Sequence, residues 1–387
     1  MLSPNPVSLL CALLLCLPLA IVFTSTGTTN LKPKATIAGI LGGNPRGNFL
    51  FVGSGGTHTS REAKNSEEDK FVIPLPEDDE ALFRVAAHAK AKPVSPRKIA
   101  FVFLTTTPLP FAPFWESYFN GTPKNLFNIY IHADPNFSYD PPFTGVFSDR
   151  VIYSKHTERY SPTLISAARR LLAHALIKDS SNYMFVLLSA SCIPLHSFRF
   201  TYNTLVNSRK SFIEILNNEI GSYDRWAARG PDVMLPEVRL EDFRIGSQFW
   251  ALTRKHAKLV VADRTLWSKF GLPCVRWDTC YPEENYFPTL LSMWDARGCV
   301  PATLTHVDWR DRNDGHPRTY NASEVGPELI ESMRRQRPRY GDDGSNGSDW
   351  YTSTSGRWND PFLFARKFSP DALEPLMRIA NDVIFRD

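Results

Sequence analysis

Motifs that mark several common enzyme classes are missing from this sequence. It has no Gly-x-Gly-x-x-Gly after its first predicted strand, no Walker phosphate loop, no His-Glu-x-x-His and no Gly-x-Ser-x-Gly. Nicotinamide-dependent, nucleoside triphosphate-dependent, zincin and esterase activities therefore lack their usual sequence support. Asp-x-Asp, which many enzymes acting on nucleotide sugars use to hold a divalent metal, is also absent.

The net charge is small, and the sequence has no cluster of metal-ligating residues. The 44 Lys and Arg residues nearly cancel the 40 Asp and Glu residues, which leaves a net charge of +4. Such a balance gives no extended basic field, so we expect no nucleic-acid partner. Because no Cys-x-x-Cys pair and no His/Cys cluster at ligand spacing occurs, the sequence predicts no structural zinc site.

One long apolar run lies near the N-terminus. Residues 7–23, VSLLCALLLCLPLAIVF, contain no charge and reach the lower edge of the length that crosses a bilayer. A signal anchor and a cleaved signal peptide both have this pattern. We favour an anchor that follows a short cytoplasmic tail, residues 1–6, and that places the rest of the chain in the lumen of the secretory pathway.

Glycosylation sequons and cysteines agree with a luminal location. Four Asn-x-Ser/Thr sequons occur, at Asn120, Asn136, Asn321 and Asn346, and each is a candidate glycosylation site. Four cysteines lie outside the apolar run and are candidates for disulfides in an oxidising lumen: Cys192, Cys274, Cys280 and Cys299. They allow three pairings, among which the sequence does not choose.

Composition changes near residue 96. Residues 24–95 are rich in Thr, Gly, Pro, Lys and Glu, which predicts a largely disordered stem. Within it, PEDDEALFRVAAHAK at 76–90 can form one short helix, because its acids precede its bases. A luminal domain of residues 96–387 follows.

Strand and helix patterns alternate from Lys98 onwards. Short apolar runs predict buried strands at 98–106, 127–134, 151–154 and 183–191, and Ser161-Pro162 begins a helix that ends near Lys178. This alternation predicts a layered α/β sheet with its ligand crevice beyond the carboxyl ends of the strands. Asp134 and the segment 189–192 end two of the strands, so both are expected to face the crevice.

The second half of the chain has a more mixed pattern. It predicts strands at 211–216, 247–253 and 300–309, a helix that begins at Pro282 and a final helix that begins at Ser369-Pro370. Glu283 and Glu284 head the Pro282 helix, where acids in the first turn complement the helix dipole. The buried stripe that follows consists of Phe287, Leu290, Leu291 and Trp294.

Two charged segments are candidates for chemistry. Glu283 points closer than Glu284 to the centre of the apolar stripe, so periodicity alone does not select Glu284 as a catalytic group, and helix capping explains both. Near the C-terminus, FLFARKF places Arg366 and Lys367 between two phenylalanines. Such cations can neutralise a leaving diphosphate without a metal, although a basic surface loop would have the same sequence.

The order and spacing of many short segments carry a family resemblance. The chain resembles the core-2/I-branching glycosyltransferase family, more closely its plant branch, over roughly residues 98–380. No single segment would suffice. The segments are HAD at 132–134, YSPTLISAARRLLAHAL, YMFVLLSASCIPL, DRWAARG, RIGSQFWALTR, YPEENYFPTL, VDW at 307–309 and LFARKF.

The resemblance implies a type II Golgi membrane protein with a GT-A-like, Rossmann-type mixed sheet flanked by helices. It also implies an inverting sugar transfer that needs no metal, in agreement with the missing Asp-x-Asp. The family's general base follows a Pro-acid pair and corresponds to Glu284. The lysine that contacts the diphosphate corresponds to Lys367, beside Arg366.

Further site residues follow from the same resemblance. The aspartate that closes the His-x-Asp strand lies in the family's nucleotide site and corresponds to Asp134. Ser189 is assigned to the same site because it ends a strand that is expected to face the crevice. The tryptophan after the late strand lines the acceptor site and corresponds to Trp309. Arg225 or Arg229 of DRWAARG belongs with it.

Some expectations stay open at this stage. The family's second diphosphate-binding arginine matches Arg337, Arg339 or Arg357. Pro288 is expected to kink the Pro282 helix, because its ring clashes with the carbonyl of Glu284. UDP-N-acetylglucosamine is the expected donor and a glycan or glycoprotein the acceptor, but UDP-xylose, UDP-glucuronate and a non-catalytic luminal carbohydrate-binding protein are alternatives.

Overall fold

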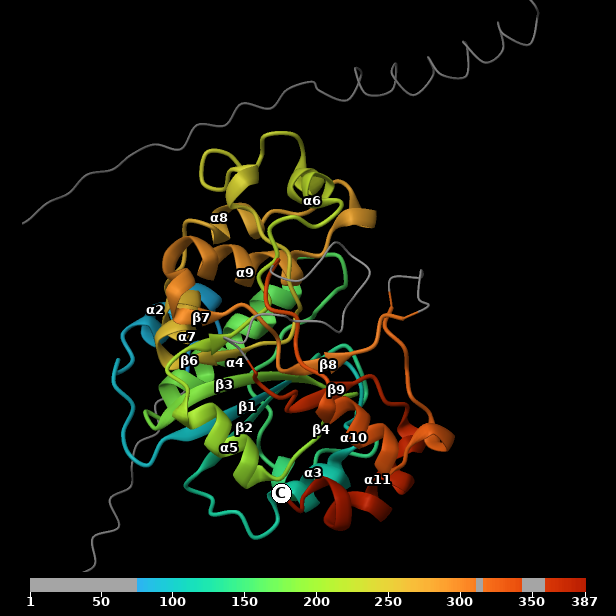
Figure 1. The fold of residues 1–387 in the computed structure, drawn as a ribbon. Coiled ribbons are helices and arrows are strands. Elements are labelled where there is room, and N and C mark those ends of the chain that lie inside the picture. Colours follow the sequence, from blue (N-terminus) through green and yellow to red (C-terminus); the bar gives the residue numbers. More distant parts are fainter. Residues whose placement is uncertain (1–74, 311–315, 343–358) are drawn as a thin grey trace, which may run out of the picture. The chain divides into compact units, whose positions relative to one another are not determined.

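The computed structural model describes residues 75–310, 316–342 and 359–387. The predicted anchor at 7–23 and most of the predicted stem lie outside these ranges. Within them, no helix combines the length and apolar character needed to cross a bilayer. The described chain forms a mixed α/β structure built on a six-stranded and a three-stranded sheet (Figure 1).

The larger sheet has the strand order β2-β1-β3-β6-β5-β7. Strand β1 lies between β2 and β3 and is parallel to both, whereas β6 runs antiparallel to both β3 and β5. The sheet is therefore mixed, as expected. Its strands are β1 Lys98–Thr105, β2 Phe127–Ala133, β3 Asn182–Ser189, β5 Ser211–Phe212, β6 Ala251–Thr253 and β7 Cys299–Val300.

Alternating side chains of β1 separate two hydrophobic cores. Phe101 and Phe103 pack into one core with α3 (Ala112–Phe119) and α5 (Phe198–Asn207). Ala100 and Val102 point to the other core, because successive side chains of a strand face opposite sides of the sheet. That second core contains residues of α4 (Thr163–Lys178), α7 (Arg254–Ala262) and α9 (Pro282–Asp295).

Helix α2 (Asp79–Ala87) confirms the short helix predicted within the stem. Leu82, Phe83 and Ala86 are buried in the second core, and Arg170 of α4 pairs with Asp79. The folded domain therefore begins before residue 96, because this helix packs on α4 and α7 rather than lying in a separate stem.

The smaller sheet brings the C-terminal part of the chain beside the larger one (Figure 1). Its order is β4 (Ile193–Pro194), β9 (Phe364–Arg366) and β8 (Thr305–Val307). Residues of α10 (Pro327–Arg335) and α11 (Leu373–Ile379) pack into the first core with this sheet. The final helix predicted from Ser369-Pro370 is thus confirmed, with a 3₁₀ turn at Pro370–Ala372 before α11.

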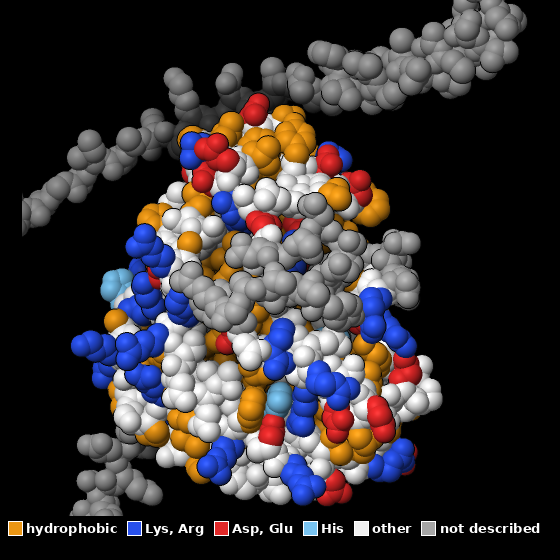
Figure 2. Space-filling model, viewed as in Figure 1, with side chains coloured by type: hydrophobic (Ala, Val, Ile, Leu, Met, Phe, Trp, Pro, Cys, Tyr) orange, Lys and Arg blue, Asp and Glu red, His pale blue; other side chains and the backbone are white. Residues whose placement is uncertain are grey.

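The remaining helices are short. They are α6 (Ser222–Trp226), α8 (Trp267–Phe270), the 3₁₀ segments Gly145–Phe147, Ala227–Arg229, Leu240–Asp242, Trp277–Thr279, Ala296–Gly298 and Ala322–Glu324, and a π-helical turn at Ala380–Ile384. Exposed hydrophobic side chains gather at the top of the face shown in Figure 2, where Figure 1 places α6. Ile220, Tyr223 and Leu240 belong to this part of the chain and are exposed.

Several predicted elements differ in the structure. VIYS at 151–154 is not a strand: Val151 makes one isolated bridge, to Ile131. The predicted strand at 300–309 divides into β7 and β8, which lie in different sheets. Burial along α9 ends at Leu291, and Trp294 is 60% exposed, so the predicted buried stripe does not include Trp294.

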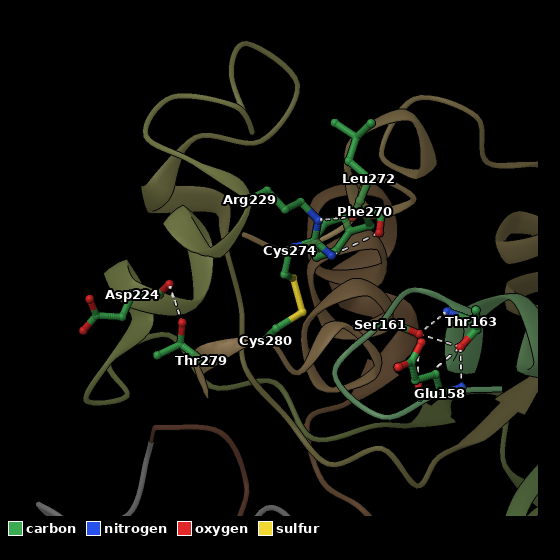
Figure 3. Close-up of a disulfide and its surroundings, with 10 residues drawn as sticks. All are labelled: Glu158, Ser161, Thr163, Asp224, Arg229, Phe270, Leu272, Cys274, Thr279 and Cys280. Atoms are coloured by element: carbon green, nitrogen blue, oxygen red, sulfur yellow. Dashed lines mark hydrogen bonds between the residues drawn. A yellow bond between two sulfur atoms is a disulfide. The ribbon is translucent and has the colours of Figure 1, made fainter. Parts of the chain in front are cut away.

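One of the possible disulfides is formed. Cys274 and Cys280 are bonded (Figure 3), whereas Cys192 and Cys299 are buried free thiols. The expectation of disulfides is therefore correct for one pair and wrong for the other two cysteines, whose side chains lie in separate hydrophobic cores. Among the sequons, Asn120, Asn136 and Asn321 are exposed, and Asn346 lies outside the described residues.

Candidate active site

A cavity of about 520 Å³ lies at the carboxyl ends of the central strands. Thr105 ends β1, Ser189 ends β3, and both line the cavity. Strands β2 and β3 flank β1 on opposite sides, so the chain reverses its direction across the sheet here. Open α/β sheets bind ligands at such a switch point, and the predicted crevice is found there.

The first turn of α9 reaches this cavity. Pro282 occupies the start of the helix, Glu283 and Glu284 follow, and both glutamates line the cavity. The helix continues through Pro288, which has no N–H for the carbonyl of Glu284. Gly246 fills that role: its N–H donates to the Glu284 carbonyl oxygen at 2.9 Å.

Gly246 can come this close because it has no side chain. A Cβ atom there would lie 2.1 Å from the carbonyl oxygen of Glu214, far inside van der Waals contact. Gly246 lines the cavity together with Ser247, Gln248 and Phe249. Because Pro288 has no N–H, the Glu284 carbonyl is free to accept the N–H of Gly246. This bond attaches the cavity wall that contains Gly246 to the first turn of α9.

Arg225 holds the side chain of Glu284. Its Nη1 donates to Oε2 of Glu284 at 2.8 Å, and its guanidinium lies 4.7 Å from the ring centre of Tyr281. Within the described residues, no hydrogen bond reaches Oε1 of Glu284. The ion pair joins α6 to the start of α9 across 59 positions of sequence.

Two neighbouring carboxyls have raised pKa values. Burial raises the pKa of Glu283 to about 7, and the charge of Glu284 adds to this effect. Burial also raises the pKa of Glu214 to about 7, although Arg339 opposes the change. Both line the cavity. Sequence reasoning assigned no function to either, since Glu283 is explained by capping and Glu214 lies within an apolar run.

Cations reach the same cavity from the C-terminal part of the chain. Arg366 ends β9, Lys367 follows it, and both line the cavity that Glu284 lines. The guanidinium of Arg366 lies 4.5 Å from the ring centre of Phe249, and burial lowers its pKa. Its Nε atom is buried without a hydrogen-bond partner in the described part of the chain.

Two of the three candidate arginines also line the cavity. Arg339 pairs with Glu219 at 2.9 Å, and Nε of Arg337 donates to Asn359 at 2.5 Å. Arg357 lies outside the described residues. Across residues 75–310, 316–342 and 359–387, no group of three or more His, Cys, Asp and Glu side chains is placed to hold a metal ion.

Asp134 supports the cavity from behind. It is fully buried and is not among the described residues that line the cavity. Its carboxylate accepts hydrogen bonds from the N–H and the hydroxyl of Thr157, both at 2.7 Å, and from the N–H of Asn136. Burial works to raise its pKa, but these bonds outweigh burial and lower the pKa to about 2. Thr157 itself lines the cavity.

The predicted acceptor residues divide into two groups. Trp309 lines the cavity and is 40% exposed, and Arg225 contacts Glu284 at its edge. Arg229 is buried, and its guanidinium donates to the carbonyl oxygens of Leu272 and Phe270 (Figure 3). The structure therefore places Arg229 in a supporting position, outside the described lining of the cavity.

A serine-histidine-aspartate chain lies elsewhere and is structural. The hydroxyl of Ser211 contacts Nδ1 of His256 at 2.7 Å, and Nε2 of His256 contacts Asp295 at 3.0 Å. Ser211 is fully buried, its hydroxyl also accepts from the N–H of Thr253, and it is absent from the described cavity lining. These bonds join β5, α7 and the end of α9.

A cavity that combines carboxylates with cations at the switch point of a mixed α/β sheet suits an enzyme that transfers a group from an anionic donor. Comparisons with known proteins specify that class. The family model described as "Branch: Core-2/I-Branching enzyme" matches residues 99–334. The chain is also 32% identical over 320 residues to "Glycosyltransferase BC10" of Oryza sativa subsp. japonica, which covers 75% of this chain and 78% of that protein.

The chain therefore belongs to the core-2/I-branching enzyme family and is a glycosyltransferase. Its mixed sheet flanked by helices fits a GT-A-like fold. A glycosyltransferase takes a sugar from a donor and passes it to an acceptor, so the cavity must serve both. The matched range includes Glu284 and ends before Arg366 and Lys367.

Proposed function

We propose that the protein transfers a sugar, N-acetylglucosamine, from a UDP-sugar to a hydroxyl of a glycan or glycoprotein acceptor in the Golgi lumen. The transfer inverts the anomeric centre and needs no metal. One observation carries the proposal: Glu284 and Lys367 line the same cavity of about 520 Å³ although 83 positions, 367 minus 284, separate them in sequence.

Glu284 acts as the general base in this scheme. It takes the proton from the acceptor hydroxyl as that oxygen forms a bond to the anomeric carbon, and the bond from that carbon to the diphosphate breaks. The electron pair of the broken bond leaves with UDP. Arg225 supports this role because it contacts one carboxylate oxygen and thereby fixes the orientation of the group.

Lys367 and Arg366 stabilise the departing UDP. A cluster of positive charge in a partly buried site can offset the charge that develops on a diphosphate. The buried Nε of Arg366, which has no partner within the described chain, supports this assignment because such a donor is costly unless a ligand satisfies it. Arg339 and Arg337 line the same cavity and are candidates for the second diphosphate contact.

The location rests on sequence evidence. The uncharged segment at 7–23 and the exposed asparagines of three sequons support a type II membrane protein with a luminal catalytic domain. Peptide-N-glycosidase treatment of the protein from a eukaryotic host should increase its electrophoretic mobility. Loss of the shift only in the triple variant Asn120→Gln, Asn136→Gln and Asn321→Gln would identify the modified sites.

Donor identity and catalysis are tested together. The purified luminal domain is incubated with UDP-N-acetylglucosamine, UDP-xylose and UDP-glucuronate, and UDP release is measured with and without excess EDTA. We expect release from UDP-N-acetylglucosamine that EDTA does not reduce. Preference for UDP-xylose or UDP-glucuronate would change the donor and keep the mechanism. A domain that binds glycans but neither binds nor hydrolyses a UDP-sugar would instead be a carbohydrate-binding protein.

A further inference from the structure

Three aromatic side chains meet at the edge of the cavity. Tyr160 and Tyr281 line it, and their ring centres are 5.6 Å apart. Trp277 packs edge-to-face on Tyr160 at 6.0 Å and is nevertheless 69% exposed. We call these three residues the aromatic rim. A tryptophan that packs on a cavity residue and keeps most of its surface in water presents a large uncovered apolar face.

The loop that carries Trp277 is held in place on several sides. The Cys274–Cys280 disulfide closes it, and the hydroxyl of Thr279 donates to the carbonyl oxygen of Asp224 in α6 (Figure 3). Arg276 pairs with the carboxylate of Asp224 at 2.9 Å. The exposed position of Trp277 is therefore built by covalent and polar contacts, which makes it available to a ligand at low entropic cost.

Tyr160 has an unusual backbone conformation. Its φ angle is +61°, which non-glycine residues rarely adopt and which is most costly for bulky side chains. The turn around it is fixed by hydrogen bonds: the hydroxyl of Ser161 donates to the carbonyl oxygen of Glu158, and the N–H of Glu158 donates to the hydroxyl of Thr163 (Figure 3). Such conformations gather at ligand sites, and this one brings the Tyr160 ring to Tyr281.

We propose that the aromatic rim binds the sugar rings of a glycan acceptor that lie beyond the ring that reacts. The proposal rests on the function proposed above. A pyranose ring has an apolar C–H face that stacks on an aromatic ring, and a polar edge that needs hydrogen-bond partners. The rim supplies both, because guanidinium groups accompany the rings: Arg225 lies 4.7 Å from the Tyr281 ring centre and Arg159 lies 5.7 Å from that of Tyr160.

The position of the rim favours the acceptor over the donor. Arg225 contacts both Tyr281 and Glu284, so the rim is continuous with the carboxylate proposed to activate the acceptor hydroxyl. The cations proposed for the diphosphate lie at the end of β9 and just after it, in the smaller sheet. An acceptor chain whose reactive sugar reaches Glu284 would extend from there across Tyr281 and Tyr160 to Trp277.

The test compares two exposed tryptophans. Trp277→Ala is matched with Trp294→Ala, because Trp294 is 60% exposed and lies at the far end of α9, outside the described cavity lining. Binding of each full luminal domain is measured on an array of oligosaccharides of galactose, xylose, glucose and N-acetylglucosamine, with each parent monosaccharide alongside. Thermal unfolding checks that both variants are folded.

The expected result is a loss of preference for length. Wild type should bind its best oligosaccharide more tightly than the parent monosaccharide. Trp277→Ala should lower the affinity for that oligosaccharide by about tenfold, which corresponds to the free energy of one good aromatic contact. Trp277→Phe should recover part of the loss, and Trp294→Ala should behave as wild type. Equal binding of oligosaccharide by wild type and Trp277→Ala, or no binding to any oligosaccharide, would overturn the proposal.

The outcomes also separate this proposal from the proposed function. If oligosaccharide binding depends on Trp277 but the protein turns over no UDP-sugar, the proposed role of the aromatic rim would stand and the transferase mechanism would be wrong. If the protein turns over a UDP-sugar and Trp277→Ala leaves the acceptor affinity unchanged, the transferase mechanism would stand and the proposed role of the aromatic rim would be wrong. If Trp277→Ala disturbed only the binding of a protein partner, the rim would be a protein contact and the glycan proposal would be wrong.

Discussion

Replacing Glu284 by glutamine should lower the turnover number by about 10²- to 10⁴-fold, the usual contribution of a general base. That loss corresponds to about 3 to 5 kcal/mol of activation free energy. Glutamine keeps the shape of the side chain and its contact with Arg225, and it removes the atom that accepts the proton. The variant should still bind UDP, because the residues proposed to contact the diphosphate are unchanged.

The structure indicates that this loss would not come from unfolding. The Arg225 and Glu284 side chains are 25% and 30% exposed, and a pair this accessible contributes at most about 1 kcal/mol to stability. The carbonyl of Glu284, which accepts the N–H of Gly246, is the same in glutamine. A steady-state UDP-release assay, paired with thermal unfolding, therefore separates the chemical effect from the structural one.

Glu283→Gln is the matched control, one residue away in the same turn. The pKa of Glu283 is about 7, so wild type already carries this side chain largely neutral at pH 6, and the variant should lose far less turnover there than Glu284→Gln. If Glu283 were the base, wild-type turnover would rise with pH up to about 7. Near-normal turnover by Glu284→Gln together with an inactive Glu283→Gln would refute the assignment of Glu284.

Three further predictions concern the cavity wall. Lys367→Ala should weaken UDP binding about 10- to 100-fold in calorimetry, and activity that is lost in EDTA and restored by manganese would contradict this role of the lysine. Because the pKa of Glu283 rises from 4.5 to about 7 on folding, the free energy of unfolding of wild type should fall by up to about 3 kcal/mol as pH rises through this window. Denaturant titrations should show that Glu283→Gln removes this part of the fall. An unchanged pH dependence in the variant would show that Glu283 is not buried. Gly246→Ala should cost about 1–3 kcal/mol of stability through overpacking and reduce turnover, whereas a variant as stable as wild type would show that the Glu214 carbonyl can move away.

The sequence predicted best those elements that are determined by local pattern. The strands β1, β2 and β3 are continuous apolar runs, which indicate burial on both faces of a sheet, and α4 and α9 begin at proline signals that act over a few residues. The expectation for Pro288 was also local, because a proline has no N–H to bond the carbonyl of Glu284. What the sequence could not supply was the replacement donor, because Gly246 approaches only after the sheet and helix have packed.

The candidate site shows the same division. Glu284 and Lys367 were selected through the family resemblance, and the structure brings both to one cavity. The raised pKa of Glu214 had no sequence signal, since it depends on burial and on charges from distant segments. Asp134 was expected in the crevice because it ends a strand, yet its side chain points to Thr157 instead, and strand position does not determine the direction of a side chain in the loop that follows.

The carboxylates and the cations of the cavity come from different parts of the fold, and this affects how acceptor specificity can diverge. The carboxylates stand on α9, which belongs to the core on one side of the larger sheet, whereas Arg366 and Lys367 extend from the smaller sheet on the other side. Under the proposed function, changes in the loops around Trp277 and Tyr160 can therefore alter which polysaccharide is modified while the machinery for the nucleotide stays intact. Paralogues and engineered variants could exchange acceptors by varying those loops alone.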